Sequence, residues 1–267
     1  MLAYLTYWYL LPVGILIAIL AMSAGISGSN FWIPVYLIFL GLDEKISFWL
    51  ALLTMIFGFG SGIIRNVKEK TVNWYIVKEY LKIAVPFAIF GTILIPFAPV
   101  QLLLLFFASF VFLYGAYLLY RYWFSYNEEE AAGLQRHNKI YWKRAAIGGF
   151  LKGLIATGTG KLIMPGILGH SRIRTPAEAV GSTVLIIFVV NLCALLFRLT
   201  PEFVQSLVIE KDLIFSIMIW VAPGVILGGQ IGPAIAGKLS VKEMRIYVGV
   251  LLLGVAILIY LRAFMIF

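Results

Sequence analysis

Two short polar stretches hold the residues of this apolar chain whose types and spacing could do chemistry. One reads ATGTGKLIMP, residues 156–165, and the other reads GISGSNFWIP, residues 25–34. Both place glycine beside hydroxyl side chains directly before an apolar run, and the first also holds Lys161. Glycine lets a ligand approach the backbone closely, and hydroxyl, amide and ammonium groups donate hydrogen bonds. This combination is suited to binding a small anion.

The glycine–lysine pair does not make a nucleotide site. A P-loop needs the pattern G-x-x-x-x-G-K-[ST] after a strand. Here Ile155 stands where the first glycine belongs, and Leu162 follows the lysine. The stretch GISGS also fails to match the G-x-S-x-G nucleophile elbow. The apolar segments offer no set of His, Asp and Glu for catalysis or metal binding, so we expect no enzyme, no cofactor and no metal.

The composition indicates the elements that must position these stretches. Apolar residues make up 62% of the chain and charged residues 12%, whereas soluble domains have about 45–50% and about 25%. The sequence therefore predicts an all-α polytopic membrane protein whose main partner is the lipid bilayer. Because basic residues gather in cytoplasmic loops, the net charge of +9 does not indicate nucleic acid.

Hydropathy predicts six full membrane spans and two broken hairpins. The spans lie at about 46–64, 80–97, 101–121, 177–197, 213–236 and 243–261, each near the ~20 residues that cross a bilayer. The hairpins, residues 2–42 and 145–171, are interrupted at 25–30 and 156–161. Each break precedes a helix of about a dozen residues, which reaches only about half-way across. Non-helical backbone at that depth lines a cavity or is buried in protein.

The positions of the basic residues predict the orientation. With the loop at 65–82 inside, the inside loops hold fifteen lysines and arginines, and the outside segments hold four: Lys45, Arg198, Lys211 and Arg262. This bias follows the positive-inside rule and places both termini outside. The polar stretch at 124–144 then becomes a cytoplasmic linker.

The two halves of the chain form a predicted repeat. At an offset of 131 residues, Pro34 aligns with Pro165 and the two polar stretches overlie each other; at an offset of 137, both halves show P-x4-G-x4-P, from Pro86 and from Pro223. The first repeat covers residues 1–123 and the second 145–267, each a hairpin plus three spans. An odd number of crossings inverts the second half, and interrupted helices at matching positions of inverted repeats indicate a transporter's binding site.

The short helices are expected to begin near Phe31 and Leu162. Their first amides lack intrahelical partners and lie at the positive end of the helix dipole, which suits an anion. Lys161 is expected deep in the membrane, where it either binds the anion or compensates charge, whereas for Lys152 snorkelling to the cytoplasmic interface is favoured. The predicted substrate-binding residues are Ser27, Gly28, Ser29, Asn30, Thr157, Gly158, Thr159, Gly160 and Lys161.

Other polar residues within the spans give weaker signals. Asn191 and Gln230 are interpreted as interhelical hydrogen-bonding residues, with a place along the substrate pathway as the alternative. All twelve carboxylates fall in loops or at span ends, although proton- or sodium-driven transporters usually carry one in the membrane. An anion exporter need not, because negative charge leaves down an inside-negative potential.

The duplicated breaks resemble those of the TauE/SafE sulfite exporter family of bacterial and archaeal membrane proteins. The family pattern, G-x-G-G-G before an apolar run and a proline, is matched by Gly25-Ile-Ser-Gly-Ser ahead of Pro34 and by Ala156-Thr-Gly-Thr-Gly ahead of Pro165. Serines, a threonine and an alanine replace several family glycines, and Lys161 stands where an apolar residue is common. The resemblance implies a location in the cell (inner) membrane and export of sulfite, sulfoacetate or a related small organosulfur anion.

Two functions therefore remain open from the sequence. The first is an exporter of sulfite or a small organosulfonate that works by alternating access, with the anion between two helix N-termini. The alternative is a passive channel for small oxyanions, which the lack of intramembrane carboxylates fits equally well. The sequence does not define the coupling ion or the oligomeric state.

Overall fold

The structure is a computed structural model that describes residues 2–23, 27–124, 136–236 and 241–265. The described residues are helical apart from short connections and contain no strand beyond one isolated bridge, between His137 and His170. Six helices are long and apolar enough to cross a membrane, which confirms the predicted all-α fold. They are α3 (Glu44–Lys68), α4 (Trp74–Ile93), α5 (Val100–Phe124), α9 (Pro176–Phe197), α11 (Lys211–Ala236) and α12 (Val241–Met265).

The spans begin where a small polar side chain caps the first turn. Asp43 accepts hydrogen bonds from the first amides of α3, and Asn73 accepts one from Ile76 in α4. Thr175 caps α9 in the same way, one residue before Pro176. Such side chains satisfy amides that lack an intrahelical partner, and proline fits the first helical position because it has no amide hydrogen. Local sequence therefore defines these helix starts.

The predicted hairpins consist of short helices on either side of a break. The first pairs α1 (Leu10–Ser23) with α2 (Ser29–Pro34), which continues as the π-helical segment η2 (Val35–Phe39). The second pairs α7 (Trp142–Ile155) with α8 (Thr159–Leu168). Both second helices begin two or three residues earlier than expected from Phe31 and Leu162. Three further short helices complete the described fold: η1 (Leu2–Tyr7), η3 (Ile95–Phe97) and α10 (Pro201–Ile209).

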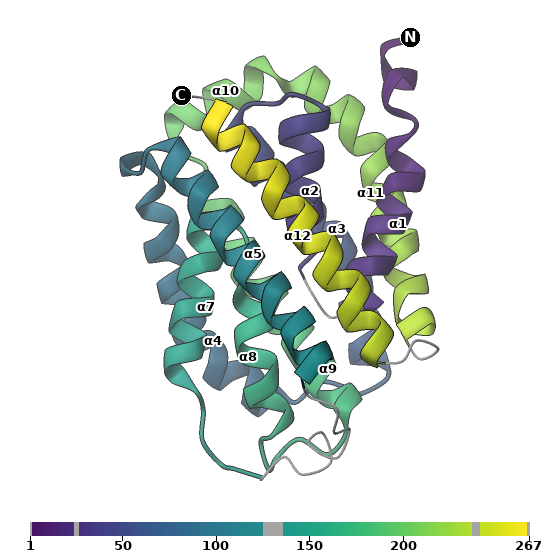
Figure 1. Cartoon of the computed structure of the whole chain (residues 1–267), viewed down its shortest axis with the longest axis vertical. Helices are drawn as coiled ribbons and strands as arrows, with labels where there is room; N and C mark the ends of the chain where they lie inside the picture. The colour runs from purple at the N-terminus through teal and green to yellow at the C-terminus, as the bar shows by residue number, and fades with distance from the viewer. Residues whose placement is uncertain (1, 24–26, 125–135, 237–240, 266–267) are drawn as a thin grey trace.

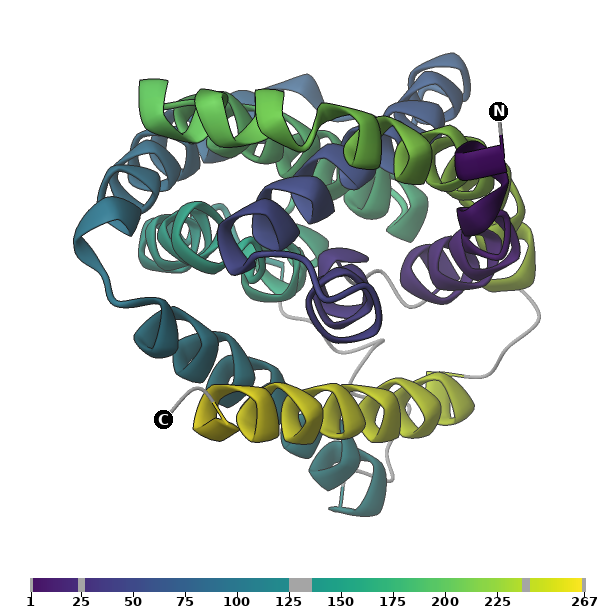
Figure 2. The same cartoon turned by 90° about the horizontal axis from the view of Figure 1, so that it is seen from above.

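Helices of the two halves pack against each other in matching pairs. The first hairpin helix α1 packs on α11 of the second half, and α7 packs on α4 of the first. The equivalent pairs α3–α9 and α5–α12 also cross between halves, and α5 and α12 form a layer in front of the short helices (Figure 1, Figure 2). This reciprocity supports the predicted duplication, while the inverted relation and its boundaries stay a prediction.

Two aligned glycines show the same reciprocity in atomic detail. A Cβ at Gly91 of α4 would lie 2.3 Å from the carbonyl oxygen of Phe150 in α7. A Cβ at Gly228 of α11 would lie 2.5 Å from the carbonyl oxygen of Ile15 in α1. Each glycine thus lets a span press its backbone onto the hairpin of the other half, as small residues do in membrane helix packing. The two glycines are the central residues of the two P-x4-G-x4-P segments.

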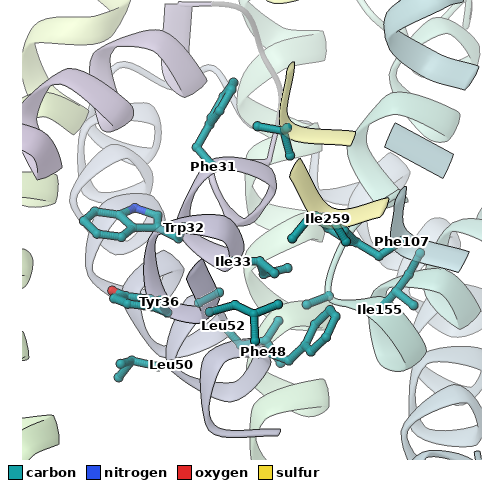
Figure 3. Packing of buried hydrophobic residues seen from close by; sticks show 14 of the residues in the cluster. Phe31, Trp32, Ile33, Tyr36, Phe48, Leu50, Leu52, Phe107, Ile155 and Ile259 are labelled. Atoms are coloured by element: carbon teal, nitrogen blue, oxygen red, sulfur yellow. The ribbon is translucent and has the colours of Figure 1, made fainter. Parts of the chain in front are cut away.

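The main apolar core surrounds the α2–η2 helix. Phe31, Trp32, Ile33 and Tyr36 are buried on it, and Trp32 stacks on Tyr36 with 5.1 Å between ring centroids. Figure 3 shows residues of α3, α5 and α12, together with Ile155, packed around this helix. The ends of α3, α5 and α8 and the starts of α4 and α9 lie at one end of the bundle, and the described parts of both chain ends lie at the other (Figure 1).

Candidate anion site at the two helix breaks

The second break is shaped by two residues with positive φ. Ala156 ends α7 in the left-handed conformation, with φ 58° and ψ 15°, and Gly158 precedes α8 with φ 111°. A left-handed residue after a helix C-terminus turns the chain sharply and is usually glycine. The turn places the Ala156 carbonyl next to the first break, where Ser29 donates a hydrogen bond to it.

Direct hydrogen bonds join the two breaks. Ser29 Oγ donates to the Ala156 carbonyl at 2.7 Å, and Thr157 Oγ1 donates to Asn30 Oδ1 at 2.7 Å. Asn30 Nδ2 in turn donates to the carbonyl of Ser27 at 2.8 Å, which holds the amide in place. All five residues are buried. The structure therefore brings together predicted site residues from stretches 127 positions apart.

Lys152 closes these contacts into a ring. Its Nζ donates to the Ala156 carbonyl at 2.9 Å and to Ser27 Oγ at 3.2 Å. Ser27 Oγ and Ser29 Oγ lie 2.7 Å apart. Because the single hydroxyl hydrogen of Ser29 already goes to Ala156, Ser27 is the donor in the serine pair. The ring runs from Lys152 through Ser27 and Ser29 to Ala156 and directly back.

The position of Lys152 corrects the snorkelling interpretation. The side chain is only 1% exposed, and its Nζ binds the carbonyl of Ala156, four residues further along the chain. A lysine near a helix C-terminus can bind the last carbonyls, which lack intrahelical donors. The left-handed Ala156 leaves such a carbonyl inside the protein, so Lys152 finds a partner there rather than at the interface.

Lys161 is buried without a hydrogen-bond partner. Its side chain is 8% exposed, and Nζ has no acceptor among the described residues. It lies over the aromatic rings of Tyr114 and Phe110 in α5, 4.2 Å and 5.3 Å from their centroids. A desolvated cation–π contact gives about 2 kcal/mol, which is less than the several kcal/mol that burial of an ammonium costs. An anion near Lys161 would supply the difference.

Arg198 is a third buried basic residue, although the distribution of basic residues in the sequence predicts that it lies in an outside segment. It follows the last residue of α9, is 9% exposed, and donates through Nη2 to the carbonyls of Gly153 and Leu154 at 2.7 Å and 3.2 Å. Together with Lys152 it therefore binds the last carbonyls of α7. The signal available in the sequence was its place directly after an apolar span, from which a long side chain can reach back inside.

The charge around the breaks is unbalanced. Lys152, Lys161 and Arg198 are buried there, and no aspartate or glutamate is buried anywhere in the part of the chain that the structure describes. Buried charges are normally paired. The arrangement thus combines basic side chains that no buried carboxylate balances, hydroxyl donors and the first amides of α8, whose start has no side-chain cap. Chemically, it can bind an anion.

The remaining predicted residues lie in varied surroundings. Thr159 Oγ1 donates to the Gly148 carbonyl at 2.8 Å and so fastens α8 to α7. Asn191 Nδ2 donates to the Leu52 carbonyl and Gln230 Nε2 to the Ser61 carbonyl. Both amides therefore form the interhelical bonds expected by default, and a pathway role for them stays a prediction. Gly28, Gly158 and Gly160 are buried backbone positions at the breaks, and Gly25 of the family pattern lies outside the described residues.

A narrow pocket beside the first break is apolar. It lies between α1, α2, α3 and α11, and the lining includes Gly28 and a single hydroxyl, that of Thr54. Its other lining residues include Ile17, Ala18, Ala21, Met55 and Val225. Because its lining has no charged group, this pocket is unsuited to an anion.

Comparison with known proteins identifies the family of the chain. The family model described as sulfite exporter TauE/SafE matches residues 10–259. No curated protein and no solved structure matches the chain. The family match includes both hairpins and all six spans apart from the last residues of α12. The chain belongs to the TauE/SafE sulfite exporter family.

Proposed function

We propose that this member of the TauE/SafE family exports sulfite or a small organosulfonate such as sulfoacetate by alternating access. The observation that carries the proposal is the group of buried basic side chains at two hydrogen-bonded helix breaks. Lys152, Lys161 and Arg198 lie there without a buried carboxylate among the described residues. A sulfonate or sulfite ion offers three oxygen acceptors and the negative charge that this region lacks.

The anion is held between the breaks by donors that now bind protein. Ser29 and Thr157 rotate their hydroxyls from Ala156 and Asn30 towards the anion, and the first amides of α8 add donors at the positive end of the helix dipole. The lysines supply full charges on either side of this break. An anion with two charged groups, such as sulfoacetate, can engage both ammonium groups.

Alternating access uses the contacts between the halves. The bonds from Ser29 to Ala156 and from Thr157 to Asn30 join the two hairpins directly, so opening towards one face requires these bonds to break or exchange. Within the proposal, the basic loops face the cytoplasm and both termini lie outside the cell membrane. The anion therefore leaves towards the side on which α3 begins and α9 ends.

Transport by reconstituted protein tests the proposal. Proteoliposomes are loaded with radiolabelled sulfoacetate or sulfite, and efflux is measured for wild type, Lys152→Met and Lys161→Met. We expect saturable efflux and counterflow for wild type and at least a tenfold loss of efflux at low substrate for either variant, since removing a charge-assisted hydrogen bond costs about 1.5–3 kcal/mol. Lys82→Met is the matched control because Lys82 is 67% exposed and pairs with Glu79.

The outcome separates the alternatives. Unchanged efflux in both lysine variants would show that the anion binds elsewhere. Non-saturable efflux with single-channel currents would favour the passive anion channel. The hydrogen bonds that close the two breaks onto each other favour the transporter, because an open pore has no need for them.

A further inference from the structure

The hydrogen bonds of Lys152 match a neutral amine better than an ammonium ion. Its Nζ has two acceptors, Ser27 Oγ and the Ala156 carbonyl. An amine has two N–H donors, whereas an ammonium ion has three. A third N–H would have no acceptor among the described residues around this side chain, which is 1% exposed. The ring as it stands is therefore complete without a charge on Lys152.

The neighbours of Lys152 also oppose a charge. Two basic groups act on it, Arg198, which directly follows α9, and Lys161 of α8, and a charge on either of them opposes a charge on Lys152. The surface of α4 that packs on this part of α7 presents Ala88 and Thr92. The first break contributes the neutral side chains Ser27, Ser29 and Asn30, and the undescribed residues 24–26 are Ala, Gly and Ile, which have no ionisable side chain. On α5, the rings of Phe110 and Tyr114 face Lys161.

An anion that binds at the breaks supplies both the third acceptor and the negative charge that an ammonium ion at Lys152 needs. It brings negative charge into a region where the described residues include no buried carboxylate, and its oxygens accept the third N–H of an ammonium ion. Charge-assisted hydrogen bonds of this kind are stronger than neutral ones. Binding of the anion and protonation of Lys152 therefore favour each other, by the same factor in both directions.

We propose that Lys152 is the proton-binding residue of the site and takes up one proton from water as the anion binds. The Lys152 amine accepts the proton on its lone pair and becomes an ammonium ion paired with the anion. When the anion leaves, the proton returns to water, and no other bond forms or breaks. This inference rests on the proposed function, and it gives Lys152 the role that a carboxylate has in many proton-coupled transporters.

Proton uptake changes what drives transport. An anion accompanied by one proton carries one negative charge fewer across the membrane, so the membrane potential contributes less to its export. The concentration gradient of the anion then contributes more, and a pH difference across the membrane becomes part of the driving force. Export of this kind is favoured when the anion accumulates in the cytoplasm.

Calorimetry of the full chain in nanodiscs tests the inference. Sulfoacetate is titrated at pH 8 into wild type in phosphate and in Tris, two buffers with very different ionisation heats. Both acidic groups of this probe are ionised at pH 8, because carboxyl groups have a pKa of about 4, so it releases no proton itself. We expect the difference in heat to correspond to about one proton taken up per anion bound, for wild type and for the exposed-lysine control Lys82→Met.

Variants of the buried lysines assign the proton. Lys152→Arg keeps a permanent charge, so we expect it to bind sulfoacetate with no proton uptake, and Lys152→Met likewise to show none. Equal heats of binding in the two buffers for wild type would overturn the inference and leave the anion site intact. Proton uptake that persists in Lys152→Arg and disappears in Lys161→Met would overturn the assignment to Lys152. Absence of any sulfoacetate binding by wild type would refute the proposed site, and this inference with it.

Discussion

The contact between α7 and α4 gives the sharpest test of how the site is positioned. Gly153 lies beside Lys152 on α7, where a Cβ would be only 2.0 Å from the carbonyl oxygen of Ala88 and 2.9 Å from the amide nitrogen of Thr92. Both are backbone atoms, so no side chain can move aside. Gly153→Ala therefore has to displace α7 from α4 by about 1 Å, and overpacking of this kind costs about 1–3 kcal/mol. We expect the loss of stability to lie at the upper end of this range.

The displacement is expected to reach the site as well. The carbonyl of Gly153 accepts a hydrogen bond from Arg198, and Lys152 and Ala156 move with α7. The measurement is the thermal unfolding midpoint of the purified protein in detergent, together with sulfoacetate affinity. We expect a midpoint several degrees lower and weaker binding, since about 1 kcal/mol shifts the midpoint of a chain of this size by roughly 2–4 °C.

A matched glycine on α12 provides the control. An ideal Cβ at Gly254 has nothing within 4 Å, so Gly254→Ala makes the same chemical change in a helix without a clash. We expect it to be neutral or slightly stabilising, because alanine has the higher helix propensity by about 1 kcal/mol. If Gly153→Ala unfolds at the same temperature as Gly254→Ala, the close approach of α7 and α4 is refuted.

Three further predictions concern the breaks and the loop at one end of the bundle. Thr157→Val leaves the buried Asn30 Oδ1 without its donor and should lower the free energy of unfolding by about 1–3 kcal/mol. Thr157→Ser keeps the hydroxyl and should keep the stability. Equal free energies of unfolding for the two variants in chemical denaturation would contradict this. Ser29→Ala removes the other bond between the breaks and should cost about 1 kcal/mol and weaken sulfoacetate binding, which titration calorimetry checks. His170 lies outside the spans, and burial together with His137 lowers its pKa. Its contribution to stability is therefore complete above about pH 6.5, the pKa of histidine in the unfolded chain, and is lost as the pH falls through the lower pKa of the folded protein. We expect His170→Gln to make the unfolding midpoint less sensitive to acid.

Much of the fold follows from the sequence because the bilayer imposes a simple length rule. Apolar runs of about 20 residues must cross, and all six predicted spans correspond to described helices. The short helices after the breaks begin two or three residues earlier than the sequence predicts. Ser29, Asn30 and Thr159 are poor helix formers in isolation, and their inclusion in α2 and α8 depends on tertiary contacts, such as the bond from Thr159 to Gly148.

The partners within the site were harder to predict. Glycine, hydroxyl and lysine in two aligned breaks indicated where the polar contacts lie, but not which atoms meet. The position of Lys152 depends on a left-handed turn at an alanine, a conformation that the residue type disfavours. The position of Arg198 depends on a long side chain that reaches back from the end of α9 to α7. A count of charges in loops does not show in which direction such a side chain points.

Among the described residues, the buried lysines and Arg198 all lie in the second of the two predicted repeats. The residue 131 positions before Lys152 is Ala21, and the one before Lys161 is Asn30. Ala21 lines the apolar pocket beside the first break, with Met55 among its neighbours, so a lysine there would enter apolar surroundings. The second half therefore supplies the lysines and the first half the serine hydroxyls and the Asn30 amide. Both halves must stay in contact for Lys152 to keep Ser27 Oγ as an acceptor, since the Ala156 carbonyl belongs to its own half. Within the proposal, any movement that separates the breaks therefore also changes how readily this residue holds a proton.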